Sequence, residues 1–404
     1  MTLRVYNSLS RKREVFPREI RDVKMFVCGP TVYDYAHLGH ARTYTAFDNI
    51  VRYLKFLGYS LHYLMNITDV ADKIFDKASN LKRDPRDFTL EFEQAFKADI
   101  QALGIDSVES YERASDHIPP MIEQIKGMID KKIAYETETG VYFEVSKFPK
   151  FGALSGLSHE ELSLRRLELC STKNNPEDFS LWRKQTSAPA WDSPWGAGRP
   201  GWHVEDTAIS MQRFGETYEI HGGASELMFP HHEAELAQAE ALTGKTPFVK
   251  FWLHTGLLTV AGRKMSKSLG NVVLIRDALK EYTPQELRWF FASYHYREPV
   301  IMSKAILKRS THEFHSFQNN IEAFRSNLAS KSKTGRLDRL TTNLEQNFRR
   351  SMDNDFYTPG ALESLSTYAV QLSNLAKGRK ISEHSRERAE AQLHRLGAIL
   401  GIEI

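Results

Sequence analysis

The stretch FVCGPTVYDYAHLGHAR, residues 26–42, decides the fold. It begins as the apolar end of a buried strand, turns at Gly29 and Pro30, and continues into a run of apolar residues at helical spacing that stops near Gly58. The next run, YSLHYLMN, is again typical of a strand. This order predicts a right-handed parallel crossover, and therefore an α/β fold built on a doubly wound, Rossmann-like parallel sheet.

Composition places the chain among ordinary globular proteins. Its 404 residues are 41% hydrophobic and 26% charged, and 54 basic against 51 acidic residues leave a net charge of +3. So small a charge excludes a global field for nucleic acid, and any such contact has to be local. Two cysteines exclude a disulfide framework and favour a reducing, cytoplasmic setting. Without a long apolar run or a signal-peptide core, we expect a soluble protein that makes no membrane contact. We expect a monomer rather than a dimer.

The order of patterns divides the chain into parts. We expect the first half of the sheet domain in residues 1–115, an inserted connective segment in 116–190 and the second half of the sheet in 191–260. Residues 261–305 hold a lysine-bearing loop and a contact region. Residues 306–404 are helical and charged, and they predict a bundle of antiparallel helices.

Two histidines stand where the first long helix is predicted to begin. His37 and His40 bracket Leu38 and Gly39 in its first turn. Free backbone N–H groups and the positive end of the helix dipole favour an anion there, and two imidazoles add directional donors for phosphate oxygens. The alternative is a pair of surface histidines without a ligand.

A second candidate element lies far downstream, in AGRKMSKSLGN, residues 261–271. Lys264 and Lys267 carry flexible ammonium groups on a loop flanked by glycine. Such groups can follow the charge that builds on a departing diphosphate, which stabilises a transition state electrostatically. A solvated basic loop is the alternative interpretation.

HLGH and KMSKS together resemble the paired signatures of class I aminoacyl-tRNA synthetases. Within that class the chain resembles the cysteinyl-tRNA synthetase family over nearly its whole length. The matching stretches are FVCGPTVYDYAHLGHAR, NITDVADKI, NPEDFSLWR, SPWGAGRPGWHVE, IHGGASELMFPHHEAELAQ, WLHTGLL, KMSKSLGN, ASYHYREPV and DNDFYTPGAL. The resemblance implies that cysteine and Mg-ATP form cysteinyl-adenylate and pyrophosphate, and that the cysteinyl group then passes to the 3′ end of tRNA(Cys).

The resemblance also implies residue roles. The implied catalytic residues are His37, His40, Lys264 and Lys267. The implied ATP-binding residues are His37, Gly39, His40, His254, Gly256, Lys264, Ser266 and Lys267. The implied substrate pocket consists of Gly29, Thr68, Trp202 and His203, although core packing would also explain the tryptophan. The chain reads GGASE where the family reads GGGSD, so Ala224 and Glu226 are departures near the nucleotide.

The family holds one zinc ion with two cysteines, a histidine and a glutamate. Cys28, His231 and Glu235 match these positions, but GWHVED replaces GWHIEC and places Asp206 at the second cysteine. Because a carboxylate is also a zinc ligand, we expect the ion to be retained in a harder, more Lewis acidic site. Weak or absent metal binding is the alternative, and it would remove the physical basis for selecting sulfur over oxygen.

The end of the chain leaves the acceptor open. It ends at LGAILGIEI, where most family members continue, so we expect no anticodon-reading module and tRNA contact through the acceptor arm, the 261–305 region and the bundle. Exposed basic residues such as Arg309 would contact tRNA phosphates in that case. The alternative is that they only face solvent. A tRNA-independent paralogue that passes cysteine or another small amino acid to a small amine or carrier is one alternative, with the mycothiol-pathway cysteine ligase as the nearest alternative relative. A non-catalytic regulatory homologue is another.

Overall fold

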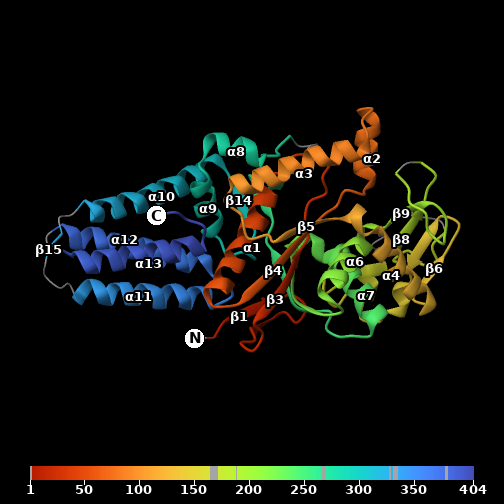
Figure 1. Ribbon diagram of the computed structural model, residues 1–404, viewed down its shortest axis with the longest axis horizontal. Coiled ribbons are helices and arrows are strands. Elements are labelled where there is room, and N and C mark those ends of the chain that lie inside the picture. Colours follow the sequence, from red (N-terminus) through yellow and green to blue (C-terminus); the bar gives the residue numbers. More distant parts are fainter. Residues whose placement is uncertain are drawn as a thin grey trace.

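A five-stranded parallel sheet forms the centre of the molecule (Figure 1). The computed structural model describes residues 2–163, 172–187, 189–265, 270–326, 329–330, 335–377 and 381–404. The strands of the sheet are β3 (Asp22–Val27), β4 (Ser60–Ile67), β5 (Ser110–Arg113), β10 (Tyr218–Ala224) and β11 (Val249–Thr255). Their order is β11-β10-β3-β4-β5, and all neighbours run parallel. This confirms the parallel α/β sheet that the sequence predicts.

The winding direction of the sheet reverses between β3 and β10. The chain passes from β3 through α1 (Leu38–Phe56) to β4 and then β5, and it later returns to β10 on the other side of β3. In open parallel sheets, ligands bind beyond the carboxyl ends of the strands at such a switch point. Cys28 lies there, and its N–H donates to the carbonyl oxygen of Gly222 at 3.0 Å.

Helices cover the sheet because their apolar faces need burial. On α1 the residues Tyr44, Phe47, Ile50, Val51 and Leu54 are all buried, at the spacing of one helix face. The other helices of this region are α2 (Asp72–Asn80), α3 (Pro85–Ala102), α6 (Trp202–Phe214), α7 (Glu233–Thr243), α8 (Ile275–Glu281) and α9 (Pro284–Ala292).

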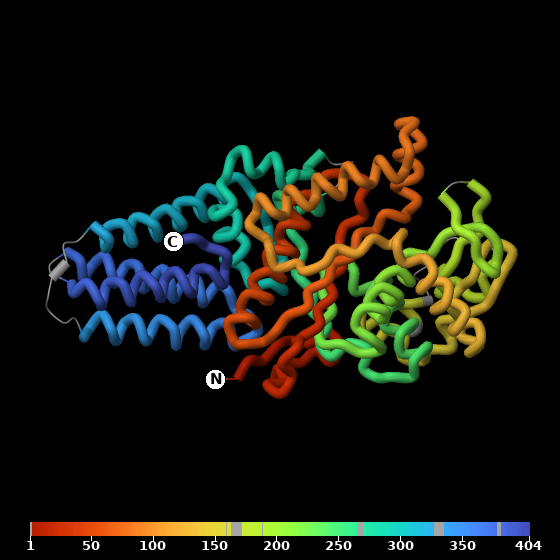
Figure 2. The backbone as a smooth tube through the Cα atoms, in the orientation of Figure 1, coloured from red at the N-terminus to blue at the C-terminus, as the bar shows by residue number. Residues whose placement is uncertain are grey.

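Two smaller units flank the sheet at opposite ends of an elongated molecule (Figure 2). At one end is an antiparallel sheet of β6 (Ala134–Glu136), β7 (Gly140–Phe143), β8 (Phe179–Lys184) and β9 (Gly198–Pro200), covered by α4 (Ile118–Asp130). At the other end is the helical bundle of α10 (Lys304–Arg325), α11 (Gly335–Met352), α12 (Thr358–Ala376) and α13 (Glu383–Ile399). The insertion and the bundle follow the predicted order, and the domain boundaries stay predictions.

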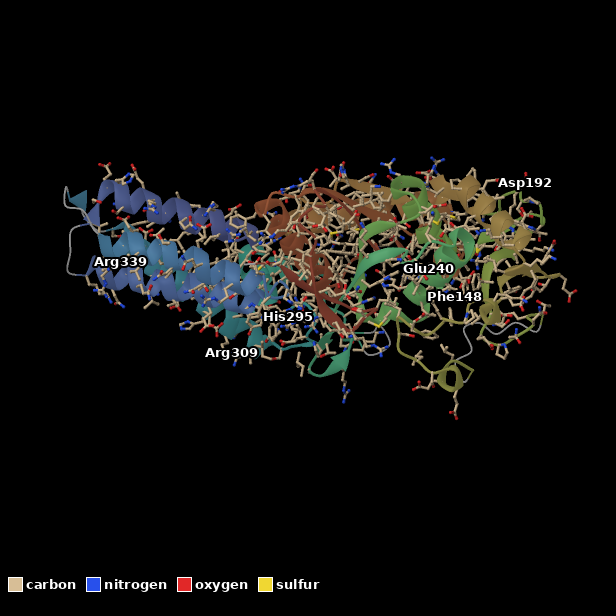
Figure 3. The ribbon with its side chains drawn as sticks, turned by 90° about the horizontal axis from the view of Figure 1, so that it is seen from below. Phe148, Asp192, Glu240, His295, Arg309 and Arg339 are labelled. Carbon is tan, nitrogen blue, oxygen red and sulfur yellow. The ribbon has the colours of Figure 1, made fainter. Side chains whose placement is uncertain are left out.

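Short strands complete the description. They are β1 (Arg4–Asn7), β2 (Lys12–Val15), β12 (Leu258–Val260), β13 (Arg263–Lys264), β14 (Val300–Met302), β15 (Ala329–Ser330) and β16 (Ile381–Ser382). A short α-helix, α5 (His159–Ser163), follows the antiparallel strand β7 in the chain. Arg309 on α10 and Arg339 on α11 are exposed on the bundle (Figure 3). In the described ranges, none of the helices has both the length and the apolar character to span a membrane.

A buried ion pair joins α9 to α1. The side chains of Arg288 and Asp48 are 1% and 0% exposed. The guanidinium also donates to the carbonyl oxygen of Leu400 at 3.0 Å and to Oδ1 of Asn49 at 2.9 Å. It therefore fastens the end of the chain to the helix that leads away from the site.

We expect Asp48→Ala to lower the free energy of unfolding by about 3–5 kcal/mol, because it leaves the buried Arg288 charge without its carboxylate. The matched control is Asp106→Ala, since that carboxylate also pairs with an arginine, Arg52, but is 79% exposed. It should cost about 1 kcal/mol or less. Urea denaturation of both variants measures the difference, and equal losses would contradict the burial argument.

Candidate active site and metal centre

In the turn after β3, the backbone of Gly29 lies unusually close to the backbone of β4. A Cβ atom at Gly29 would lie 1.7 Å from the backbone oxygen of Asn66, so only glycine fits there. The Gly29 N–H also donates to Oδ1 of Asn66 at 2.6 Å. The backbone packing of β3 against β4 thus explains this glycine, beside the pocket role that the sequence suggested.

The two histidines cap α1 with their rings. Nδ1 of His37 accepts from the N–H of Gly39 at 3.1 Å, and the N–H of His37 donates to Nδ1 of His40 at 3.2 Å. The rings stack at 4.0 Å between centroids. Because the accepting nitrogen of a neutral imidazole carries no proton, the proton of each ring is on Nε2.

Backbone donors at this helix start are already in use, which corrects the expectation of free N–H groups. The N–H groups of the first turn donate within the protein: Leu38 to the carbonyl oxygen of Val273, Gly39 to the His37 ring, and His40 and Ala41 to the carbonyl oxygen of His37. The Nε2–H groups of the two histidines are therefore the donors that α1 can offer to a phosphate.

Burial keeps both rings neutral. It lowers the pKa of His40 to about 3, with a smaller contribution from His37, and burial also lowers the pKa of His37. Both groups are therefore hydrogen-bond donors at neutral pH and not cations.

A cavity of about 200 Å³ opens in front of these rings. Its walls include many of the residues that the sequence singled out, from both halves of the sheet. They are Cys28, Gly29, His37, Gly39, His40, Trp202, Ala224, Glu226, Gly256 and Lys264. The early histidine motif and the late lysine loop thus meet at one cavity.

Lys264 enters this cavity from the lysine loop. Its ammonium group forms an ion pair with Glu226, and the two side chains are 69% and 44% exposed. Both therefore remain accessible to a ligand in the cavity. Ser266 and Lys267 lie outside the described residues.

Four predicted metal ligands converge at the inner wall. The ligand atoms of Cys28, Asp206, His231 and Glu235 all lie within 4.8 Å of one another, and all four residues are buried. Oδ2 of Asp206 is 3.1 Å from Sγ of Cys28 and 3.0 Å from Nε2 of His231, which is 3.2 Å from Oε1 of Glu235. His231 lies in the irregular turn before α7, and only Glu235 lies in the helix proper.

The chemistry of this cluster fits a divalent cation. Burial, then Asp206 and Glu235, raise the pKa of the Cys28 thiol, and burial followed by Asp206 raises the pKa of Glu235. Within the described part of the chain, neither oxygen of Glu235 receives a hydrogen bond. Three acidic groups around one point are costly in a dry interior, whereas sulfur, nitrogen and oxygen donors in this number suit zinc.

Two further histidines border the cluster, and sequence reasoning missed them. Nε2 of His232 and of His221 lie 3.1 Å and 3.4 Å from Sγ of Cys28, so these two rings with Cys28 and Glu235 form a second possible ligand set. Nδ1 of His221 is 2.6 Å from the hydroxyl of Tyr218, and Nδ1 of His232 is 2.8 Å from Nε2 of His254. The adjacent pair in FPHHEAE was the signal that could have revealed His232.

The remaining predicted residues divide between the cavity and its support. Trp202 is 41% exposed and stacks on His231 at 4.1 Å, so it is not a core tryptophan. His203 is buried, with Nδ1 2.9 Å from Nδ1 of His231. His254 is buried behind His232, and burial lowers its pKa to about 3. Thr68 is buried beside Asn66.

Comparison with known proteins gives the class and the family. The family described as "tRNA synthetases class I (C) catalytic domain" matches residues 14–312. The structure of Mycobacterium tuberculosis methionyl-tRNA synthetase with methionyl-adenylate is similar, with a TM-score of 0.69 and 16% identity over 94% of this chain and 90% of that one. The cysteine–tRNA ligase of Methanococcus maripaludis is 44% identical over 373 residues, which cover 90% of this chain and 78% of that protein. The cysteine–tRNA ligase of Thermococcus onnurineus is 43% identical over 375 residues, which cover 90% of this chain and 79% of that protein.

The parallel sheet with the HLGH and KMSKS signatures defines a class I aminoacyl-tRNA synthetase fold. The chain belongs to the cysteinyl-tRNA synthetase family. Both the fold and the family that the sequence indicated are confirmed.

We expect His40→Asn to flatten the pH dependence of stability between pH 7 and pH 5. With a folded-state pKa of about 3, His40 stays neutral in the folded protein, while in the unfolded chain it takes up a proton below about pH 6.5. Falling pH therefore favours unfolding, by about 2 kcal/mol from pH 7 to pH 5 for this one residue. Urea denaturation of wild type and variant across this range gives the two slopes. Equal slopes would contradict a His40 ring that stays neutral in the folded protein.

Proposed function

We propose that this protein activates cysteine with ATP and transfers it to the 3′ end of tRNA(Cys). One observation carries the proposal: the cavity that His37, His40 and Lys264 line also reaches Cys28, at the edge of the buried acidic and histidine cluster. Groups suited to phosphate and groups suited to a thiol-binding metal therefore face the same small volume. The similarity to cysteine–tRNA ligases supports this reading.

Positioning and charge stabilisation perform adenylate formation in this proposal. The Nε2–H groups of His37 and His40 donate to phosphate oxygens of ATP, next to Gly39. Lys264, released from Glu226 by the arriving phosphates, and Lys267 stabilise the charge of the departing pyrophosphate, and Ser266 binds ATP in the same loop. Gly256 borders the nucleotide in the cavity wall, with His254 behind it. The cysteine carboxylate is the nucleophile, so no side chain forms a covalent intermediate.

One zinc ion would be held by Cys28, Asp206, His231 and Glu235. When bound, the ion would supply a direct ligand position for the substrate sulfur and so a means of distinguishing it from the oxygen of serine. Asp206 makes this donor set harder than one with two thiolates, because a carboxylate oxygen is less polarisable than sulfur.

The rest of the substrate pocket is formed by this chain's own side chains. Trp202, stacked on His231, provides an apolar wall for the cysteine side chain, with His203 next to it. Gly29 belongs to the cavity wall, and Thr68 is buried beside Asn66.

The partners follow from the same reaction. We place ATP and cysteine in the cavity and tRNA(Cys) along its acceptor arm, and we assign residues 1–115 and 191–260 to the catalytic domain and 261–305 to stem contact. Residues 116–190 are the inserted connective segment, and 306–404 are the bundle. We propose that the protein works as a monomer in the cytoplasm, and the free, buried thiol of Cys28 supports a reducing setting.

Cysteine-dependent ATP–pyrophosphate exchange, followed by charging of a tRNA(Cys) transcript, tests the function. We expect cysteine to give the highest exchange in a panel of amino acids, and the transcript to accept it. Exchange with cysteine but no charging would overturn the tRNA acceptor and favour a small amine or a carrier. A chain without exchange for any amino acid would overturn the enzyme itself.

Matched variants connect the reaction to the cavity. Lys264→Ala should lower exchange on the order of 10²–10³-fold, because it removes a charge that acts on the leaving group. Lys280→Ala is the control, since Lys280 is also an exposed lysine in an ion pair, with Asp277, but it lies on α8 outside the cavity wall. It should leave exchange unchanged.

A further inference from the structure

Asn66 links three segments behind the metal cluster. It lies near the carboxyl end of β4 and is 1% exposed. Its Nδ2 donates to Oδ1 of Asp206 at 2.6 Å and to Oγ1 of Thr68 at 3.3 Å. Its Oδ1 accepts from the N–H of Gly29 at 2.6 Å.

Chemistry fixes which way this amide points. The N–H of Gly29 can only donate, and an ionised carboxylate can only accept. Oδ1 of Asn66 therefore faces Gly29, and Nδ2 faces Asp206. Because the backbone of Gly29 is packed against β4, the amide cannot turn away from the carboxylate without losing both hydrogen bonds.

The two oxygens of Asp206 consequently have different surroundings. Oδ1 is occupied by the Asn66 amide, whereas Oδ2 points into the cluster, 3.1 Å from Sγ of Cys28 and 3.0 Å from Nε2 of His231. A carboxylate can bind a metal ion through one oxygen or through both. A thiolate at the same position would have a single donor atom and would need no such restraint.

We infer that Asn66 is a positioning residue that holds Asp206 as a one-oxygen metal ligand. The inference rests on the proposed zinc site. With Oδ1 held back, the ion receives four protein donors, from Cys28, Asp206, His231 and Glu235. A second oxygen from Asp206 would occupy the position that the sulfur of the substrate needs. The amide also keeps the carboxylate oriented, as partners beyond the ligands do in other metal sites.

The test is a double-mutant cycle on the full chain with Co²⁺ and Zn²⁺ as probes. Asn66→Ala is made in the wild-type protein and in the Asp206→Cys variant. Intensity of the Co²⁺ visible bands reports coordination number, and chelator competition gives the zinc affinity. In the wild-type background we expect weaker Co²⁺ bands, as Asp206 becomes a two-oxygen ligand, and about a tenfold or greater loss of zinc affinity. In the Asp206→Cys background both quantities should stay unchanged.

Controls separate a local effect from a general one. Thr68→Val removes the second partner of the Asn66 amide and leaves its bond to Asp206, so the Co²⁺ spectrum should be that of the wild type. Asn66→Ser, whose side chain is too short to reach Asp206, repeats the test if Asn66→Ala does not fold. Circular dichroism confirms folding of each variant.

The outcomes distinguish the inference from the proposed function. Equal losses in both backgrounds would overturn the inference, because they would mean that Asn66 only supports the fold. The inference would also be overturned if the wild-type protein binds metal and Asn66→Ala leaves its Co²⁺ spectrum unchanged. The zinc site would stand in that case. A wild-type protein that binds neither ion would overturn both.

Discussion

Three acidic groups that share one dry pocket set the central constraint of this structure. Cys28, Asp206 and Glu235 lie with His231 around a single point, and burial raises the pKa of the Cys28 thiol and of the Glu235 carboxyl. A divalent cation resolves this conflict, because it can neutralise thiolate and carboxylate together. The sheet provides the place: the reversal of winding between β3 and β10 brings the end of β3 close to α6 and α7. Without that topology the ligands, 207 positions apart from Cys28 to Glu235, would not meet.

The phosphate side of the cavity uses a different principle. The Nδ1 atoms of His37 and His40 accept backbone hydrogen bonds at the start of α1. Because burial keeps the rings neutral, each ring presents a fixed Nε2–H donor. Charge for the leaving group comes from Lys264, which is exposed and held by Glu226 until a ligand competes. Fixed neutral donors and a movable cation on one cavity are suited to a reaction in which charge shifts between bound groups.

Much of this could be predicted from the sequence. Apolar periodicity gave the parallel sheet and α1, and the family resemblance gave the ligand set of Cys28, Asp206, His231 and Glu235 that the structure brings together. Three features were not predictable. Capping by the His37 and His40 rings depends on side-chain rotation, and the places of His221, His232 and Asn66 depend on contacts between strands far apart in the chain. His231 lies in an irregular turn before α7, since the backbone leaves helical geometry at Phe229.

Zinc K-edge X-ray absorption of the purified protein, without and with cysteine, tests the central claim most directly. The account predicts bound zinc with one sulfur and otherwise nitrogen and oxygen ligands, from the Cys28, Asp206, His231 and Glu235 set, and a second sulfur when cysteine is added. A protein without zinc, or a zinc shell that gains no sulfur from cysteine, would contradict it.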